Sequence, residues 1–126
     1  MSIKNAITRF DMPTVNFDRA VKFYSNILGE NLHVSEFMGQ KLAIFPCEQS
    51  QDSVSGCLVP PGPNCKVSSE GTRIYLNCQG KLDAVASRVE KAGGEIMQPK
   101  FAIGEHGYIV MIRDSEGNTV GLHSGS

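Results

Sequence analysis

The stretch FDRAVKFYSNILG, residues 17–29, decides how the chain folds. Asn16 before it is a good N-cap, because its side chain can accept a hydrogen bond from a first-turn N–H. Gly29 at its end can adopt the left-handed conformation that closes a helix. The apolar residues recur every three or four positions, as on one face of an α-helix: Phe17, Ala20, Val21, Tyr24, Ile27 and Leu28. The stretch therefore predicts a helix with one buried face.

Alternating apolar and polar residues predict strands on both sides of this helix. The strands expected in the first half are residues 6–12, 32–37, 41–46 and 54–59. A segment with three prolines, residues 60–70, follows and is typical of a linker. After it the same order of elements returns: a strand at 72–78, a helix at 82–92, and strands at 95–99, 108–113 and 119–123.

The two halves match at a constant offset of 64 residues. Adding 64 to Thr8-Arg9 gives Thr72-Arg73, and Gly29 maps to Gly93. Matches in one register and at equivalent places favour an internal duplication. We therefore expect an α+β fold of two tandem βαβββ modules, with curled mixed sheets and the helices outside. Module one should span about 3–60, the linker about 60–70 and module two about 71–126.

Composition limits the classes of function. The 126 residues include 12 Lys+Arg and 13 Asp+Glu, so no basic excess exists to bind nucleic acid or an anionic membrane. No apolar run approaches the ~20 residues that span a bilayer, and the first residues lack the apolar core of a signal peptide. The four cysteines form no C-x-x-C pair, and we expect free thiols in a cytoplasmic protein.

The polar faces of three strands carry the candidate ligand-binding residues. A sheet that carries one helix buries one face beneath it. The opposite faces carry Arg9 and Asp11, then Arg73, Tyr75 and Asn77, then Thr119, Gly121 and His123. If the sheets curl towards each other, these residues share a concave surface of the kind that binds ligands. The alternative is a solvated face on which the arginines pair with Asp11 or with glutamates.

Five segments together resemble the vicinal oxygen chelate superfamily, the group of glyoxalase I, bleomycin-resistance proteins and extradiol dioxygenases. They are FDRAVKFYSNILG, GQKLAIFP, GTRIYLN, VEKAGGEIMQP and GEHGYIVMIRDSEGNTVGLHS, and they cover nearly the whole chain. The elements F-Y-x-x-x-L-G and D-x-E-G-N, in this order and spacing, are typical of the fold. The resemblance implies a single domain of this family that binds a small molecule and forms a homodimer. It does not fix the reaction, because one fold hosts many functions.

The resemblance also places the family's metal ligands on this sequence. They fall on Arg9, on Arg73, on Gly121 and near Ala43 or Phe45. An arginine has no free lone pair, and the other residues carry no donor atom. We therefore expect no cofactor at these positions. A divalent metal at another position stays open, with these nearby candidates: His123, Asp11, Glu105 and His106.

Arginines at the ligand positions indicate a different use of the cavity. Arg9 and Arg73 present planar donors that suit a carboxylate or phosphate. The further binding candidates are Asp11, Tyr75 and Asn77, and the candidate catalytic acid or base is His123. We expect a protein that binds an anionic or carbonyl-bearing small molecule. The alternatives are a lyase or isomerase of the glyoxalase I type with a non-standard site, or a protein that sequesters a drug or metabolite without chemistry.

Overall fold

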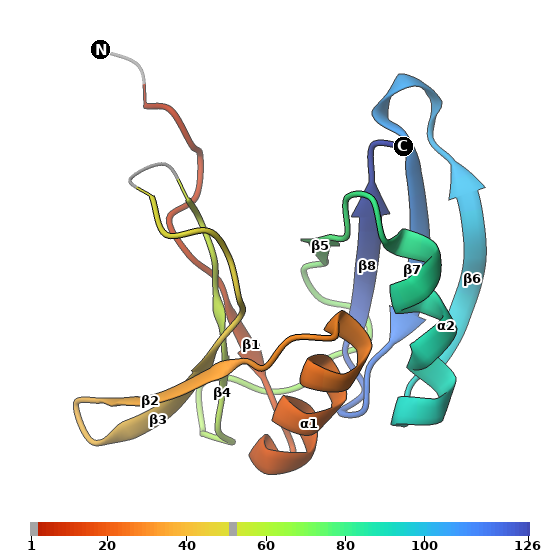
Figure 1. The fold of residues 1–126 in the computed structure, drawn as a ribbon. Helices are drawn as coiled ribbons and strands as arrows, with labels where there is room; N and C mark the ends of the chain where they lie inside the picture. Colours follow the sequence, from red (N-terminus) through yellow and green to blue (C-terminus); the bar gives the residue numbers. More distant parts are fainter. Residues whose placement is uncertain (1–2, 51–52) are drawn as a thin grey trace.

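Two four-stranded sheets, each with one helix, make up the fold in the computed structural model, which describes residues 3–50 and 53–126 (Figure 1). The first sheet has the order β1-β4-β3-β2, and its elements are β1 (Asp11–Pro13), α1 (Phe17–Leu28), β2 (His33–Phe37), β3 (Gln40–Ile44) and β4 (Cys57–Val59). The second has the order β5-β8-β7-β6, and its elements are β5 (Ile74–Asn77), α2 (Leu82–Ala92), β6 (Glu95–Ala102), β7 (Tyr108–Arg113) and β8 (Thr119–Ser124).

The strand register reproduces the internal repeat. In each sheet the first strand pairs in parallel with the last, and the other pairings are antiparallel. Asp11 pairs with Cys57 in the first sheet, and 64 residues later Tyr75 pairs with Gly121 in the second. The next pair, Met12 with Leu58, likewise corresponds to Leu76 with Leu122. The predicted tandem βαβββ fold is therefore confirmed.

Both helices begin and end as the sequence predicts. The Asn16 side chain accepts a hydrogen bond from Arg19 N at 3.1 Å. Gly29 ends α1 with φ 71°, and its counterpart Gly93 ends α2 with φ 111°. At 12 and 11 residues, neither helix of the described residues could cross a membrane.

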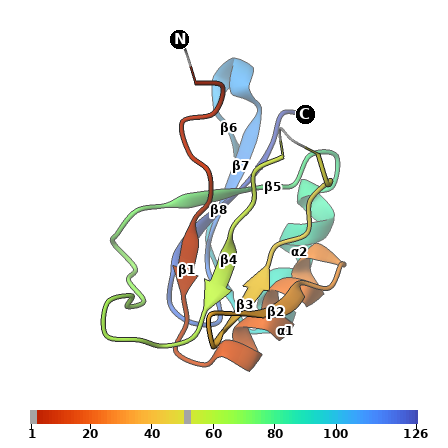
Figure 2. The ribbon, with the colours of Figure 1, turned by 90° about the vertical axis from the view of Figure 1, so that its left-hand side faces the viewer.

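One hydrophobic core joins the two modules. Each helix packs on one face of its own sheet, and the other face of each sheet carries no helix, so the expected arrangement with helices outside the sheets is confirmed. The helices also contact each other and lie on the same side of the molecule (Figure 2). The core therefore continues from one module into the next. Its largest fully buried residues include Phe23, Tyr24, Ile27, Leu58, Val85, Val89, Val110, Ile112, Val120 and Leu122.

The first strand is shorter than predicted. Residues 6–12 were expected to form it, but pairing begins only at Asp11. The reason is the partner strand, since β4 begins at Cys57 and offers residues 6–9 no ladder. Phe10 still accepts a backbone hydrogen bond from Cys57 N at 3.0 Å, and its ring lies against Gly56, where a Cβ would stand 2.4 Å from a ring carbon.

A buried carboxylate of module two holds the start of α1 in module one. The side chain of Glu116 is 0% exposed, and it accepts hydrogen bonds from Val15 N at 2.9 Å and Asn16 N at 2.6 Å. Arg19 Nε donates to its other oxygen at 2.8 Å. A negative charge at this place also interacts favourably with the N-terminal end of the helix dipole. Glu116 thereby fixes the orientation of α1 relative to the second sheet.

Asp114 and Asn118 complete this contact, and we call the three residues Asp114, Glu116 and Asn118 the inter-module clamp. The Tyr24 hydroxyl donates to Asp114 Oδ2 at 2.5 Å. Burial and the neighbouring Asp114 carboxylate raise the pKa of Tyr24 well above its ordinary value, so the hydroxyl keeps the proton that it donates. Asn118 Nδ2 donates to Pro13 O at 2.9 Å, at the end of β1.

Replacing Tyr24 tests how much this contact stabilises the fold. Tyr24→Phe keeps the ring and removes the hydroxyl, so it should lower the free energy of unfolding by about 1.5–3 kcal/mol, the range for a hydrogen bond to a charged group. Urea denaturation measures the change. The matched control is Tyr75→Phe, because Tyr75 is exposed and no hydrogen bond involves its hydroxyl within the described residues. Equal stability of the two variants would contradict the role of the clamp.

Glu116 should also make stability depend on pH. Burial raises the pKa of Glu116, but the hydrogen bonds from Arg19, Asn16 N, Ser115 and Val15 N lower it by more, so it lies below the ordinary value of 4.5. A carboxyl whose pKa is lower in the folded state contributes stability above its unfolded pKa, and that contribution is lost as pH falls through the folded pKa. Urea denaturation of the wild type should show a steeper loss of stability below about pH 4.5 than Glu116→Gln shows. Parallel pH profiles would contradict this assignment.

Candidate functional site

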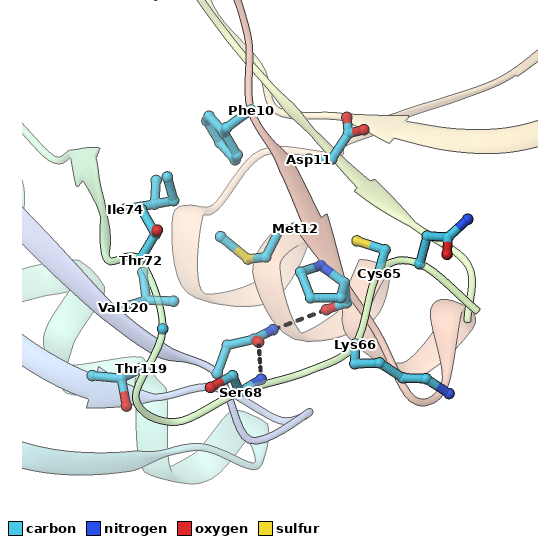
Figure 3. A pocket seen from close by; sticks show the side chains of 14 residues that line it. Phe10, Asp11, Met12, Cys65, Lys66, Ser68, Thr72, Ile74, Thr119 and Val120 are labelled. Atoms are coloured by element: carbon cyan, nitrogen blue, oxygen red, sulfur yellow. Dashed lines mark hydrogen bonds between the residues drawn. The ribbon is translucent and has the colours of Figure 1, made fainter. Parts of the chain in front are cut away.

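The seam between the two modules contains two cavities. We call seam the region where the edge strand β1, with the residues just before it, approaches the edge strand β5. Residues of both strands line the smaller cavity, whereas β5 together with Ile7 and Phe10, which precede β1, lines the larger one. The larger cavity has a volume of about 520 Å³ and the smaller about 390 Å³. Figure 3 shows the smaller one. Phe10 and Ile74, which are equivalent under the 64-residue offset, line both cavities and stand between them.

The larger cavity brings together three of the predicted binding residues. Arg73, Tyr75 and Asn77 line it, all from β5 or the residue before it. Lys81, at the start of α2, adds a second cation. Apolar side chains from both modules form much of the remaining wall, and they are Ile7, Phe10, Leu28, Phe45, Val54 and Leu76. A cavity with apolar walls and a few convergent polar groups suits a small organic ligand.

Arg73 lines the larger cavity without a charged partner among the described residues. Within residues 3–50 and 53–126, no hydrogen bond or ion pair involves its guanidinium group. Tyr75, next on the same face, is 48% exposed, and its ring covers Gly121 on the neighbouring strand. A Cβ on Gly121 would stand 2.2 Å from Tyr75 Cδ2, so only glycine leaves room for this ring. The tyrosine thus has a fixed place beside the arginine.

Arg9 and Asp11, the other predicted binding residues, form a pair. Arg9 Nε donates to Asp11 Oδ1 at 3.1 Å, and this hydrogen bond is the main reason that the pKa of Arg9 is raised. Cys57 Sγ donates to the same carboxylate oxygen at 3.4 Å. Arg9 lines neither cavity, whereas Asp11 lines the smaller one. For Arg9 the structure therefore supports the pairing with Asp11, one of the alternatives that the sequence left open.

His123, the candidate acid or base, lines neither of the two cavities, although its register partner Asn77 lines the larger one. Its Nε2 is 2.7 Å from the carbonyl oxygen of His106, in the short 3-10 turn Gly104–His106. The side chain thus holds this turn against β8. Glu105 and His106 are exposed on the same turn. None of these three residues lines either of the two cavities at the seam.

The positions at which the resemblance places metal ligands carry few donor atoms in this chain. Two are the arginines Arg9 and Arg73, and the Tyr75 ring fills the space above Gly121. The fourth position was expected near Ala43 or Phe45, but the register corrects this. Cys57 is the counterpart of Gly121, because it pairs with β1 as Gly121 pairs with β5. The Cys57 thiol is the one possible metal donor among these four positions. Burial is the main cause that raises the pKa of this thiol, and the hydrogen bond to Asp11 is the second. The described residues contain no group of three His, Cys, Asp or Glu side chains that could hold a metal ion.

Sequence reasoning missed Lys81 and the first-module wall of the larger cavity. Lys81 comes four residues after Asn77, the last residue of β5, so the sequence could have predicted that it lies near Asn77. Phe45 and Val54 both lie in the loop between β3 and β4. Their approach to β5 depends on how the two modules pack, and no local pattern of the sequence carries that information.

Comparison with known proteins places this geometry in a family. A family model described as "Glyoxalase/Bleomycin resistance protein/Dioxygenase superfamily" matches residues 6–122, which confirms the resemblance seen in the sequence. A curated relative, "Putative glyoxylase CFP32" of Mycobacterium bovis, is 29% identical over 114 residues, 89% of this chain and 42% of that protein. The chain thus spans less than half the length of this relative.

Solved structures share the fold. A glyoxalase/bleomycin resistance protein from Albidiferax ferrireducens superposes with a TM-score of 0.70 at 15% identity, over 95% of this chain and 99% of that chain. The fosfomycin resistance protein FosX from Mesorhizobium loti superposes with a TM-score of 0.62 at 13% identity, over 99% of this chain and 95% of that chain. At such low identity these likenesses concern the fold alone.

Proposed function

Because the chain belongs to the glyoxalase/bleomycin resistance protein/dioxygenase superfamily, we propose that it is a cytoplasmic protein that binds an anionic small molecule with an apolar body in the larger cavity of the seam. The four cysteines are free thiols, which suits a reducing compartment. Binding relies on side chains and needs no metal at the family's ligand positions. We also propose a homodimer, the commonest closed assembly of soluble proteins.

The observation that carries this proposal is a difference between two equivalent arginines. Under the 64-residue offset, Arg9 corresponds to Arg73 and Asp11 corresponds to Tyr75. Asp11 neutralises Arg9, but a tyrosine cannot neutralise Arg73 in the same way. The second module therefore presents a free guanidinium group to the larger cavity, next to an aromatic ring. Such a group recognises a carboxylate or phosphate through paired hydrogen bonds.

The aromatic walls of the larger cavity indicate that the ligand has an apolar body. Phe10, Phe45 and Tyr75 contribute three aromatic rings to the larger cavity. Burying an apolar body against them contributes affinity, whereas Arg73 and Lys81 orient the anionic end. A carbonyl group would be bound by the same donors. We favour binding over catalysis, because His123 lies outside the cavity.

An enzyme of the glyoxalase I type remains the second candidate. Two carboxylates, Glu30 and Glu48, also line the larger cavity and would be placed to act as general bases. Turnover of a methylglyoxal–glutathione adduct that is lost in a Glu30→Gln or Glu48→Gln variant would favour this alternative. Binding without turnover favours the sequestering protein.

Removing the free guanidinium group tests the proposal. Arg73→Ala should weaken binding of anilinonaphthalene sulfonate (ANS), an aromatic anion, by about 1.5–3 kcal/mol, the range for a charge-assisted hydrogen bond. Dye fluorescence measures binding, and thermal unfolding should remain nearly unchanged because Arg73 has no partner to lose among the described residues. Arg9→Ala is the matched control, since this equivalent arginine lines neither of the two cavities. Equal ANS affinity of the Arg73→Ala and Arg9→Ala variants would contradict the proposal.

A further inference from the structure

The smaller cavity is the counterpart of the larger one within the duplicated fold. Asp11, Met12 and Pro13 of β1 line the smaller cavity. Their equivalents under the 64-residue offset, residues 75–77 of β5, line the larger. A duplication that builds one cavity at the seam therefore builds a second one, and the two have diverged in their side chains.

One part of the wall of the smaller cavity is apolar. Met12 and Val120 are buried, and Ile74 and Phe10 complete the apolar surface (Figure 3). The linker closes one side. It is held there by the bond from Thr119 Oγ1 to Ser69 O at 2.8 Å and by a β-bridge between Gly62 and Cys65. The cavity therefore has fixed walls contributed by both modules and the linker.

The two charged side chains that line the smaller cavity, Asp11 and Lys66, point away from its apolar part. Successive residues of a strand point to opposite faces, and Figure 3 shows the Asp11 carboxylate directed away from Met12 and Ile74. That carboxylate is already paired with Arg9. The Lys66 side chain runs outward from the cavity in the same view. In contrast to the larger cavity, this one therefore suits a neutral ligand.

Hydrogen-bonding groups at the strand edge select the ligand further. Phe10 O accepts from Cys57 N, so the amide groups of Phe10 face β4. The N–H and C=O of the next residue, Asp11, then face the opposite way, towards the free edge of β1 and the cavity. Pro13 O faces the same way and is already bound by Asn118. Asp11 thus offers the cavity an adjacent donor and acceptor.

We propose that the smaller cavity is a second ligand site, for a neutral, flat, two-ring molecule whose edge carries a hydrogen-bond donor beside an acceptor, as in a cyclic amide. The rings lie between Met12, Ile74 and Val120, and the amide edge pairs with the main chain of Asp11. The Thr72 hydroxyl, which has no hydrogen-bond partner in the described part of the chain, lines the same cavity. This site is independent of the anion site beside Arg73.

Carbostyril, a fluorescent two-ring cyclic amide, is the probe, and N-methylcarbostyril, which lacks the donor, is its matched control. Carbostyril should bind the full-length protein, and the N-methyl compound should bind about tenfold more weakly, the effect of losing one good hydrogen bond. Thr72→Trp should fill the smaller cavity, weaken carbostyril binding at least about tenfold and leave ANS binding within about twofold. Val54→Trp, in the larger cavity, should do the reverse.

The same titrations can overturn the inference. It is wrong if carbostyril does not bind, if both carbostyrils bind equally, or if Val54→Trp and not Thr72→Trp abolishes carbostyril binding. Asn64→Trp, at an exposed linker position of the same cavity, replaces Thr72→Trp if that variant does not fold. ANS binding reports on the larger cavity throughout, so loss of the anion site is distinguished from loss of this one.

Discussion

The hydrogen bond from Tyr24 to Asp114 is the contact on which the rest of the structure depends. It joins the helix motif F-Y-x-x-x-L-G of the first module to the turn D-x-E-G-N of the second. Glu116 and Asn118, from the same turn, bind the start of α1 and the end of β1. Two of the sequence elements that resemble the family therefore hold the two modules together. The two residues are 90 positions apart in the chain, so this hydrogen bond joins its two halves.

This clamp places the outer strands of the two sheets opposite each other. The two modules each contribute one free strand edge to the seam. The seam contains two cavities, one on each side of Phe10 and Ile74. Function then depends on where the two halves differ. Asp11 neutralises Arg9 in the first module, whereas Tyr75 leaves Arg73 free in the second. We infer that divergence after duplication gave one charged and one neutral cavity.

Much of the fold could be predicted from local patterns. The helix period, the caps Asn16 and Gly29, and the 64-residue repeat all predict elements that the structure contains. The strand 6–12 was predicted too long, because alternation continues where β4 provides no partner. The candidate site was predicted in part, since alternation places Arg73, Tyr75 and Asn77 on one strand. The alternation of polar and apolar residues could not show that Phe45 and Val54 approach this strand. Nor could it show that the His123 side chain binds the carbonyl oxygen of His106.

The claim that Tyr75 leaves Arg73 free for a ligand has a direct test. Tyr75→Asp gives the second module the carboxylate that the first already has in Asp11. The account predicts that the introduced carboxylate pairs with Arg73 and that ANS binding falls at least about tenfold, about 1.4 kcal/mol, while the protein stays folded. Tyr75→Asn loses the same ring but is uncharged and similar in size to Asp, so it should bind ANS at least about tenfold more tightly than Tyr75→Asp. Equal ANS affinity of the Asp and Asn variants would contradict the account, because the free guanidinium group would then not be what binds the anion.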